Sequence, residues 1–205
     1  MYIEMFNKAI SSVWPMLFIF SVILILMRIA YLYTHRDKMV LYEEVLKLVF
    51  ILYILLLYYV VTFQDVNYNT SNFVPFKEIF RYKLLSTGFF KNILGNVILF
   101  IPFGMYITYY LETKKIYLPI IITVLTSITI EFAQYKIGRT ADVDDVILNI
   151  IGGILGYILY KIIHSISNRL PRSFRSQTFL NFITIILIAV ITLYLSGFKF
   201  WGIIK

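Results

Sequence analysis

Charged and amide side chains gather in one stretch of the chain, E-F-A-Q-Y-K-I-G-R-T-A-D-V-D-D-V-I-L-N, from Glu131 to Asn149. The chain has 11 acidic residues in all, and four of them fall in this stretch: Glu131, Asp142, Asp144 and Asp145. A carboxylate can act as a general base or as a ligand of Mg²⁺ or Ca²⁺. The guanidinium group of Arg139 is a planar fork that matches a phosphate. Together, these residue types suit chemistry on a phosphate group.

The spacing of these residues predicts one shared helix face. If a helix begins at Asp142, then Asp145 and Asn149 follow at intervals of three and four residues, which keeps all three on one side. Asp144 falls on the far side of that helix, and we therefore expect it to be solvated. Lys136, outside the helix, is also expected to be solvated.

A structural role competes with the chemical one. Asp142 and Asp145 resemble a helix cap, because acids favour the positive N-terminal end of a helix. Gly152 and Gly156 form a G-x-x-x-G pattern that lets another helix approach closely. Neither role accounts for Asn149, which lies one turn deeper on the same face.

Glu131 and Gln134 end the preceding apolar segment and share a face at a spacing of three residues. An ionisable group at or inside the membrane interface is costly, which favours a functional role for Glu131. The alternative is a structural ion pair with Arg139 or Lys136.

Asn92 and Asn96 add amides to an earlier apolar segment, which continues into I-P-F-G with Pro102. A proline inside a spanning helix frees one carbonyl and usually kinks the axis. Asn96 either ties two helices together or belongs to the polar site.

The composition predicts a polytopic membrane protein. Hydrophobic residues make up 60% of the chain, aromatic residues 18%, and the mean hydropathy is +0.82. The net charge of +8 then points to basic loops that face anionic lipid, and we expect no nucleic-acid partner. Cysteine is absent and only two histidines occur, which excludes disulfides and Cys-ligated metals and disfavours a His-rich site.

Six apolar segments have about the length of a membrane-spanning helix. We expect an all-α bundle in a single membrane domain over residues 1–205, with a core at 70–160. The first helix is expected to start near Ser11, Ser12 and Pro15. The predicted helices are 14–33, 45–63, 93–111, 117–135, 146–163 and 178–198.

The loop between the second and third helices predicts an interfacial or re-entrant segment at 70–85. Its aromatic residues Phe73, Phe76 and Phe80 have helix-like spacing and alternate with Lys77 and Arg81. The loops at 34–44, 112–116 and 164–177 carry the denser Lys and Arg, which predicts that they face the cytoplasm. The polar stretch would then face the extracytoplasmic side of the cell membrane.

Three motifs, in order along the chain, resemble the VanZ-like family of bacterial membrane proteins. They are N-F-V-P-F from Asn72, N-I-L-G-N-V-I-L-F-I-P-F-G from Asn92, and E-F-A-Q with G-R-T-A-D-V-D-D-V-I-L-N-I-I-G-G up to Gly153. The resemblance implies a cell-envelope protein of a family linked to resistance to teicoplanin, a lipoglycopeptide. It also implies kinship with enzymes that act on lipid head groups.

The combined prediction is a possible hydrolase or transferase of a lipid-linked phosphate, with a membrane lipid or lipid-linked envelope precursor as the partner. Asp142 and Asp145 are also the candidate ligands of Mg²⁺ or Ca²⁺. The predicted catalytic residues are Glu131, Asp142 and Asp145; the predicted substrate-binding residues are Arg139, Gln134, Asn149, Asn96 and Asn72.

A non-catalytic membrane component that alters antibiotic or lipid binding at the cell surface is the alternative. A transporter is a weaker third option, because the sequence has no internal repeat.

Overall fold

The described part of the chain is helical, as the sequence predicts. The computed structural model describes residues 2–35, 39–63 and 71–195, and within these ranges the side chains of 13–35, 39–60 and 71–193. These residues form six α-helices and no strand. They are α1 (Tyr2–His35), α2 (Leu41–Phe63), α3 (Gly95–Leu111), α4 (Tyr117–Lys136), α5 (Val143–Arg169) and α6 (Gln177–Leu195).

The helices coincide with the six predicted segments, with differences at their ends. Helix α1 runs through Pro15, which was expected near its start. A π-helical turn, Phe89–Leu94, leads into α3, and α3 continues through Pro102. The last three residues predicted for the sixth helix, 196–198, lie outside the described residues, as does residue 70 of the predicted interfacial segment.

Four stretches of the described residues are long and apolar enough to span a membrane: Val13–His35, Phe89–Leu111, Tyr117–Lys136 and Val143–Arg169. Helices α2 and α6 are 23 and 19 residues long and strongly apolar as well. The chain is thus a multi-pass membrane protein, because in lipid such apolar segments satisfy their backbone groups as helices.

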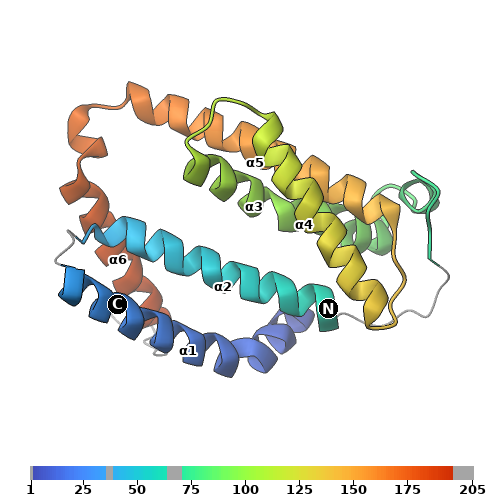
Figure 1. Ribbon diagram of the computed structural model, residues 1–205, viewed down its shortest axis with the longest axis horizontal. Helices are drawn as coiled ribbons and strands as arrows, with labels where there is room; N and C mark the ends of the chain where they lie inside the picture. The colour runs from blue at the N-terminus through green and yellow to red at the C-terminus, as the bar shows by residue number, and fades with distance from the viewer. Residues whose placement is uncertain (1, 36–38, 64–70, 196–205) are drawn as a thin grey trace, which may run out of the picture. The chain divides into compact units, whose positions relative to one another are not determined.

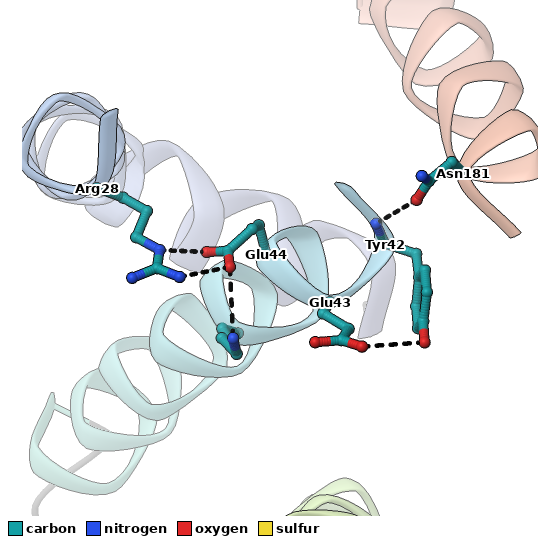
Figure 2. Close-up of polar contacts among 6 residues, drawn as sticks. Arg28, Tyr42, Glu43, Glu44 and Asn181 are labelled. Atoms are coloured by element: carbon teal, nitrogen blue, oxygen red, sulfur yellow. Dashed lines mark hydrogen bonds and ion pairs between the residues drawn. The ribbon is translucent and has the colours of Figure 1, made fainter. Parts of the chain in front are cut away.

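The chain divides into two compact units, residues 1–55 with 167–205 and residues 56–166. In the first unit, polar side chains tie the helices together (Figure 2). The Arg28 guanidinium donates to both oxygens of Glu44 at 2.7 and 2.8 Å, which joins α1 to α2. The Tyr42 backbone N–H donates to Asn181 Oδ1 at 3.1 Å, which joins α2 to α6. Bidentate pairing offsets the cost of charges in an apolar setting.

The second unit contains the whole predicted site and is built around α3, α4 and α5 (Figure 1). Small hydroxyl residues fill its interior: Thr108, Thr123 and Ser127 are 0% exposed. On the same helix α4, Leu125 and Ile128 are more than half exposed. Apolar residues outside and small polar residues inside are typical of helices that pack within lipid.

Glycines set how closely α5 approaches its neighbours. A Cβ atom on Gly152 would overlap the Val97 carbonyl of α3, and one on Gly156 would overlap the Ile101 carbonyl. Between them, the carbonyl of Gly153 lies where a Cβ on Gly104 would have to be. The predicted close packing at Gly152 and Gly156 is therefore confirmed, and the partner is α3.

Gly156→Ala is expected to destabilise the second unit, because the added methyl would have to push against helix backbone. Overpacking of this kind costs about 1–3 kcal/mol. Gly95→Ala is the matched control, since the nearest atom to its Cβ is 3.7 Å away and alanine favours the helix. Thermal stability in detergent should fall for Gly156→Ala and stay level or rise for Gly95→Ala. Equal stability of the two variants would contradict this packing.

Candidate functional site

The start of α5 is paired with a distant part of the chain, the segment of residues 71–88 that precedes the π-helical turn. The backbone N–H of Asn72 donates to the Ala141 carbonyl at 2.9 Å, and the backbone N–H of Val143 donates to the Asn72 carbonyl at 3.0 Å. These bonds supply partners to backbone groups that no helix satisfies. They bring Asn72 beside the polar stretch.

Asp142 stands immediately before α5 and caps it, as predicted. Its Oδ1 accepts the backbone N–H of Asp144 at 2.9 Å, the bond expected of an N-cap residue. The same oxygen accepts from the side-chain amide of Asn72 at 3.0 Å. The backbone N–H of Asp142 in turn donates to Glu131 Oε2 at 2.9 Å, so that Glu131 ties the end of α4 to the start of α5.

Asp144 differs from its prediction. Instead of being solvated, it is 1% exposed and accepts three backbone N–H groups, from Phe76, Glu78 and Ile79. The helical count places Asp144 on the far side of α5 from Asp142, and the error was to assume that this side faces water. The segment 71–88 covers that side and turns its N–H groups towards the carboxylate.

The segment itself is less helical than its aromatic spacing suggests. Between residues 73 and 86 its regular structure is one 3₁₀ turn at Ile79–Arg81, and Phe76 and Leu85 have positive φ angles of 67° and 63°. A left-handed conformation at a bulky residue is costly and persists where the surroundings hold it. The bonds to Asp144 hold the chain at Phe76.

Asp145 and Asn149 face two different helices. Asp145 Oδ1 accepts the side-chain amide of Asn96 from α3. The Asn149 amide, 5% exposed, donates to Ser127 Oγ of α4 at 2.9 Å. The bond to Ser127 supplies a structural explanation for Asn149, which capping could not provide.

A cavity of about 510 Å³ opens between the segment 71–88, the start of α5 and the end of α4. Of the predicted site residues it gathers five: Asn72, Gln134, Arg139, Asp142 and Asp145. Glu131, Asn96 and Asn149 do not line it and contact the lining residues or the helices behind them. Residues that the prediction did not place in the site also line the cavity; they include Lys77, Glu78, Arg81, Tyr82 and Asn92.

Charge in the cavity is mixed. Lys77, Arg81 and Arg139 line it together with acids of α5 and Glu78, and Arg81 pairs with Glu78 at 3.0 Å. Burial raises the pKa of Asp142 above its ordinary value, because the charged form loses hydration. Lys77 directly follows the N-F-V-P-F motif, but this position alone does not say that its side chain lines a cavity.

The residues fit a metal ion poorly. Within the described residues, no group of three or more acidic, histidine or cysteine side chains is placed to hold one. Asp142 Oδ1 already accepts two N–H donors, and both oxygens of Asp144 are occupied by backbone donors.

Comparison with known proteins agrees with the motifs. Residues 50–164 match a family model described as VanZ/LLP1. A protein of Enterococcus faecium named Protein VanZ is 32% identical over 141 residues, which cover 67% of this chain and 78% of that protein. No solved structure matches the chain.

Asp144→Ala is expected to release the segment 71–88 from α5. Each hydrogen bond to a charged group contributes about 1.5–3 kcal/mol, and loss of three should raise cleavage by trypsin at Lys77, Arg81 and Lys83 by more than about tenfold. The control is Glu112→Asn, which replaces an exposed acid at a left-handed position that asparagine tolerates. Unchanged cleavage in Asp144→Ala would contradict the anchoring role.

Asp142→Asn should change the dependence of stability on pH. The folded-state pKa of Asp142 is raised, so that the stability its protonation contributes is present at low pH and is lost as pH rises through that pKa. Asparagine keeps an acceptor oxygen for Asp144 and Asn72 but does not titrate.

The thermal midpoint of Asp142→Asn relative to wild type should thus be higher at about pH 8 than at about pH 4. A constant difference between the two proteins over this range would show that Asp142 does not titrate as described.

Proposed function

Because this chain belongs to the VanZ/LLP1 family of multi-pass membrane proteins, we propose that it acts on a lipid-linked phosphate head group at the outer leaflet of the cell membrane. The observation that carries the proposal is the mixed-charge cavity in the second unit. A chain that is 60% hydrophobic gathers three cations, four acids and several amides around one space at the end of a helical hairpin.

Arg139 and Lys77 are the phosphate-binding groups in this proposal. Both line the cavity, Arg139 from the turn between α4 and α5 and Lys77 from the segment 71–88. A guanidinium binds two phosphate oxygens at once, and an ammonium adds a point charge. Asn72 and Gln134, which also line the cavity, supply amide groups that orient the head group.

Asp145 is the proposed general base, oriented by its hydrogen bond from Asn96. It would take a proton from water in a hydrolase, or from an acceptor hydroxyl in a transferase. The new oxygen–phosphorus bond forms as the bond to the leaving oxygen breaks, and that oxygen receives a proton. Asp142, which lines the same cavity, is the proposed donor of this proton.

Glu131 has a positioning role in this scheme. Its carboxylate accepts the backbone N–H of Asp142 at 2.9 Å and lies behind the cavity lining. Asn149 also has a positioning role, through its hydrogen bond to Ser127 of α4. The outward orientation in this proposal rests on the prediction that the loops with the denser Lys and Arg, 34–44, 112–116 and 164–177, face the cytoplasm.

A non-catalytic function is the second candidate, and the occupied carboxylates favour it. Asp144 is saturated by backbone donors, and Asp142 caps α5. The cavity would then bind an envelope lipid or a lipoglycopeptide such as teicoplanin without reaction. Such binding would change how much antibiotic reaches the cell surface.

Lipid profiling of cells that express wild type, Arg139→Ala or Asp145→Asn separates the two functions. Catalysis predicts that wild type alters the content of a phosphate-bearing lipid and that Asp145→Asn abolishes this change at equal protein abundance. Lys136→Ala, an exposed residue outside the cavity lining, is the control and should match wild type.

Full lipid turnover by Asp145→Asn would overturn the catalytic proposal. Teicoplanin susceptibility measured on the same cells completes the test. Binding without chemistry predicts that Arg139→Ala changes susceptibility while the lipid profile stays that of cells without the protein.

A further inference from the structure

The outward side of the segment 71–88 exposes large apolar side chains. Phe80 is 83% exposed, Leu84 80%, Leu85 76% and Phe73 73%. Exposed apolar residues at this density mark an interaction surface. We call Phe73, Val74, Phe76, Phe80, Leu84 and Leu85 the apolar lip.

The apolar lip is part of a fixed structure. The segment that carries it donates backbone N–H groups of Phe76, Glu78 and Ile79 to Asp144. Asn72 also joins the segment to the chain at the start of α5 through backbone hydrogen bonds. The apolar surface is therefore presented by a segment that the core of the second unit holds in place.

The position of the lip identifies what covers it. The segment ends at Gly88, and the membrane-spanning stretch Phe89–Leu111 starts at the next residue. The lip thus lies at the edge of the membrane by chain continuity. Four basic residues, Lys77, Arg81, Lys83 and Lys91, accompany one acid, Glu78, between residues 71 and 91. Basic and aromatic residues together are typical of segments that lie in the head-group region of anionic bilayers.

The same segment has its other side in the cavity. Lys77, Ile79 and Tyr82 line the cavity between exposed members of the lip. Exposed apolar residues and cavity-lining residues thus alternate along this segment, so that a single stretch of chain separates the cavity from the exposed apolar surface.

We propose that the apolar lip inserts into the outer leaflet and forms the entrance through which a lipid head group passes sideways from the bilayer into the cavity. The apolar lip contacts acyl chains, and the basic residues outside the cavity lining, Lys83 and Lys91, contact the phosphates of neighbouring lipids. The substrate keeps its acyl chains in the membrane while its head group reaches Arg139 and Asp145. The entrance role depends on the proposed function; insertion of the lip does not.

The natural absence of cysteine makes the test direct, because any introduced cysteine is the single labelling site. The full chain carrying Phe80→Cys or Leu84→Cys is labelled with bimane and reconstituted into vesicles of phosphatidylglycerol and phosphatidylcholine. Both parent side chains are at least 80% exposed, so that the fold should tolerate the change. Lys136→Cys, at the exposed end of α4, is the control.

Insertion predicts that doxyl groups on the lipid acyl chains quench bimane at Phe80 and Leu84, while iodide in the water quenches it weakly. Lys136 should show the reverse. Quenching by iodide at Phe80 and Leu84 as strong as at Lys136 would overturn insertion. Shielding from both quenchers would also overturn it, because the lip would then pack against protein.

A second measurement separates the entrance from the function. Phe80→Asp and Leu84→Asp should lower the lipid change seen in the cell profile, since each places a charge in the acyl region, whereas Phe80→Leu should keep it. An unchanged profile with Phe80→Asp would overturn the entrance role. If quenching shows insertion but wild type causes no lipid change, insertion of the apolar lip is supported. The proposed function, and the entrance role that depends on it, are then overturned.

Discussion

The Asp144 carboxylate is the interaction on which the polar end of the second unit depends. It is buried, and it accepts backbone N–H groups from three residues of a segment that is nearly without regular structure. Without this acceptor those N–H groups would be left unsatisfied beside a membrane, which is costly. The cavity depends on this carboxylate, because it holds the segment 71–88, which forms one wall of the cavity, against α5. Asp144 therefore has a structural role, although in the sequence it lies among the acids that suggest chemistry.

The bundle beneath the cavity follows a second constraint, the close approach of α5 to α3. Gly152 and Gly156 leave room for the backbone of α3, and this contact brings Asn96 to Asp145. Hydroxyl side chains inside the bundle serve the same end, since Ser127 receives the amide of Asn149. Tight helix packing and the placement of polar groups thus depend on the same small residues. These residues permit close contact between helices, and this contact lets short polar side chains meet.

The division of labour among the acids clarifies what the cavity can do. Asp144 holds the wall of the cavity, Glu131 holds the backbone at Asp142, and Asp142 caps α5. Asp145 lines the cavity and accepts the side-chain amide of Asn96, whereas each of the other three acids accepts a backbone N–H group. The proposed function on phosphate groups therefore relies on Asp145 with Arg139 and Lys77, and the proposed lipid entrance relies on Phe80 and Leu84.

The sequence by itself determined the membrane class and the six helices, because apolar runs of spanning length have one structural solution in lipid. It also predicted the cap at Asp142 and the close packing at Gly152 and Gly156, since these depend on local spacing. Only the tertiary structure decided the role of Asp144 and the membership of Lys77 in the cavity. Both depend on a pairing of residues 70 positions apart, Asn72 with Asp142. Helical periodicity assigns a residue to a face, but the element that covers that face is decided by long-range folding.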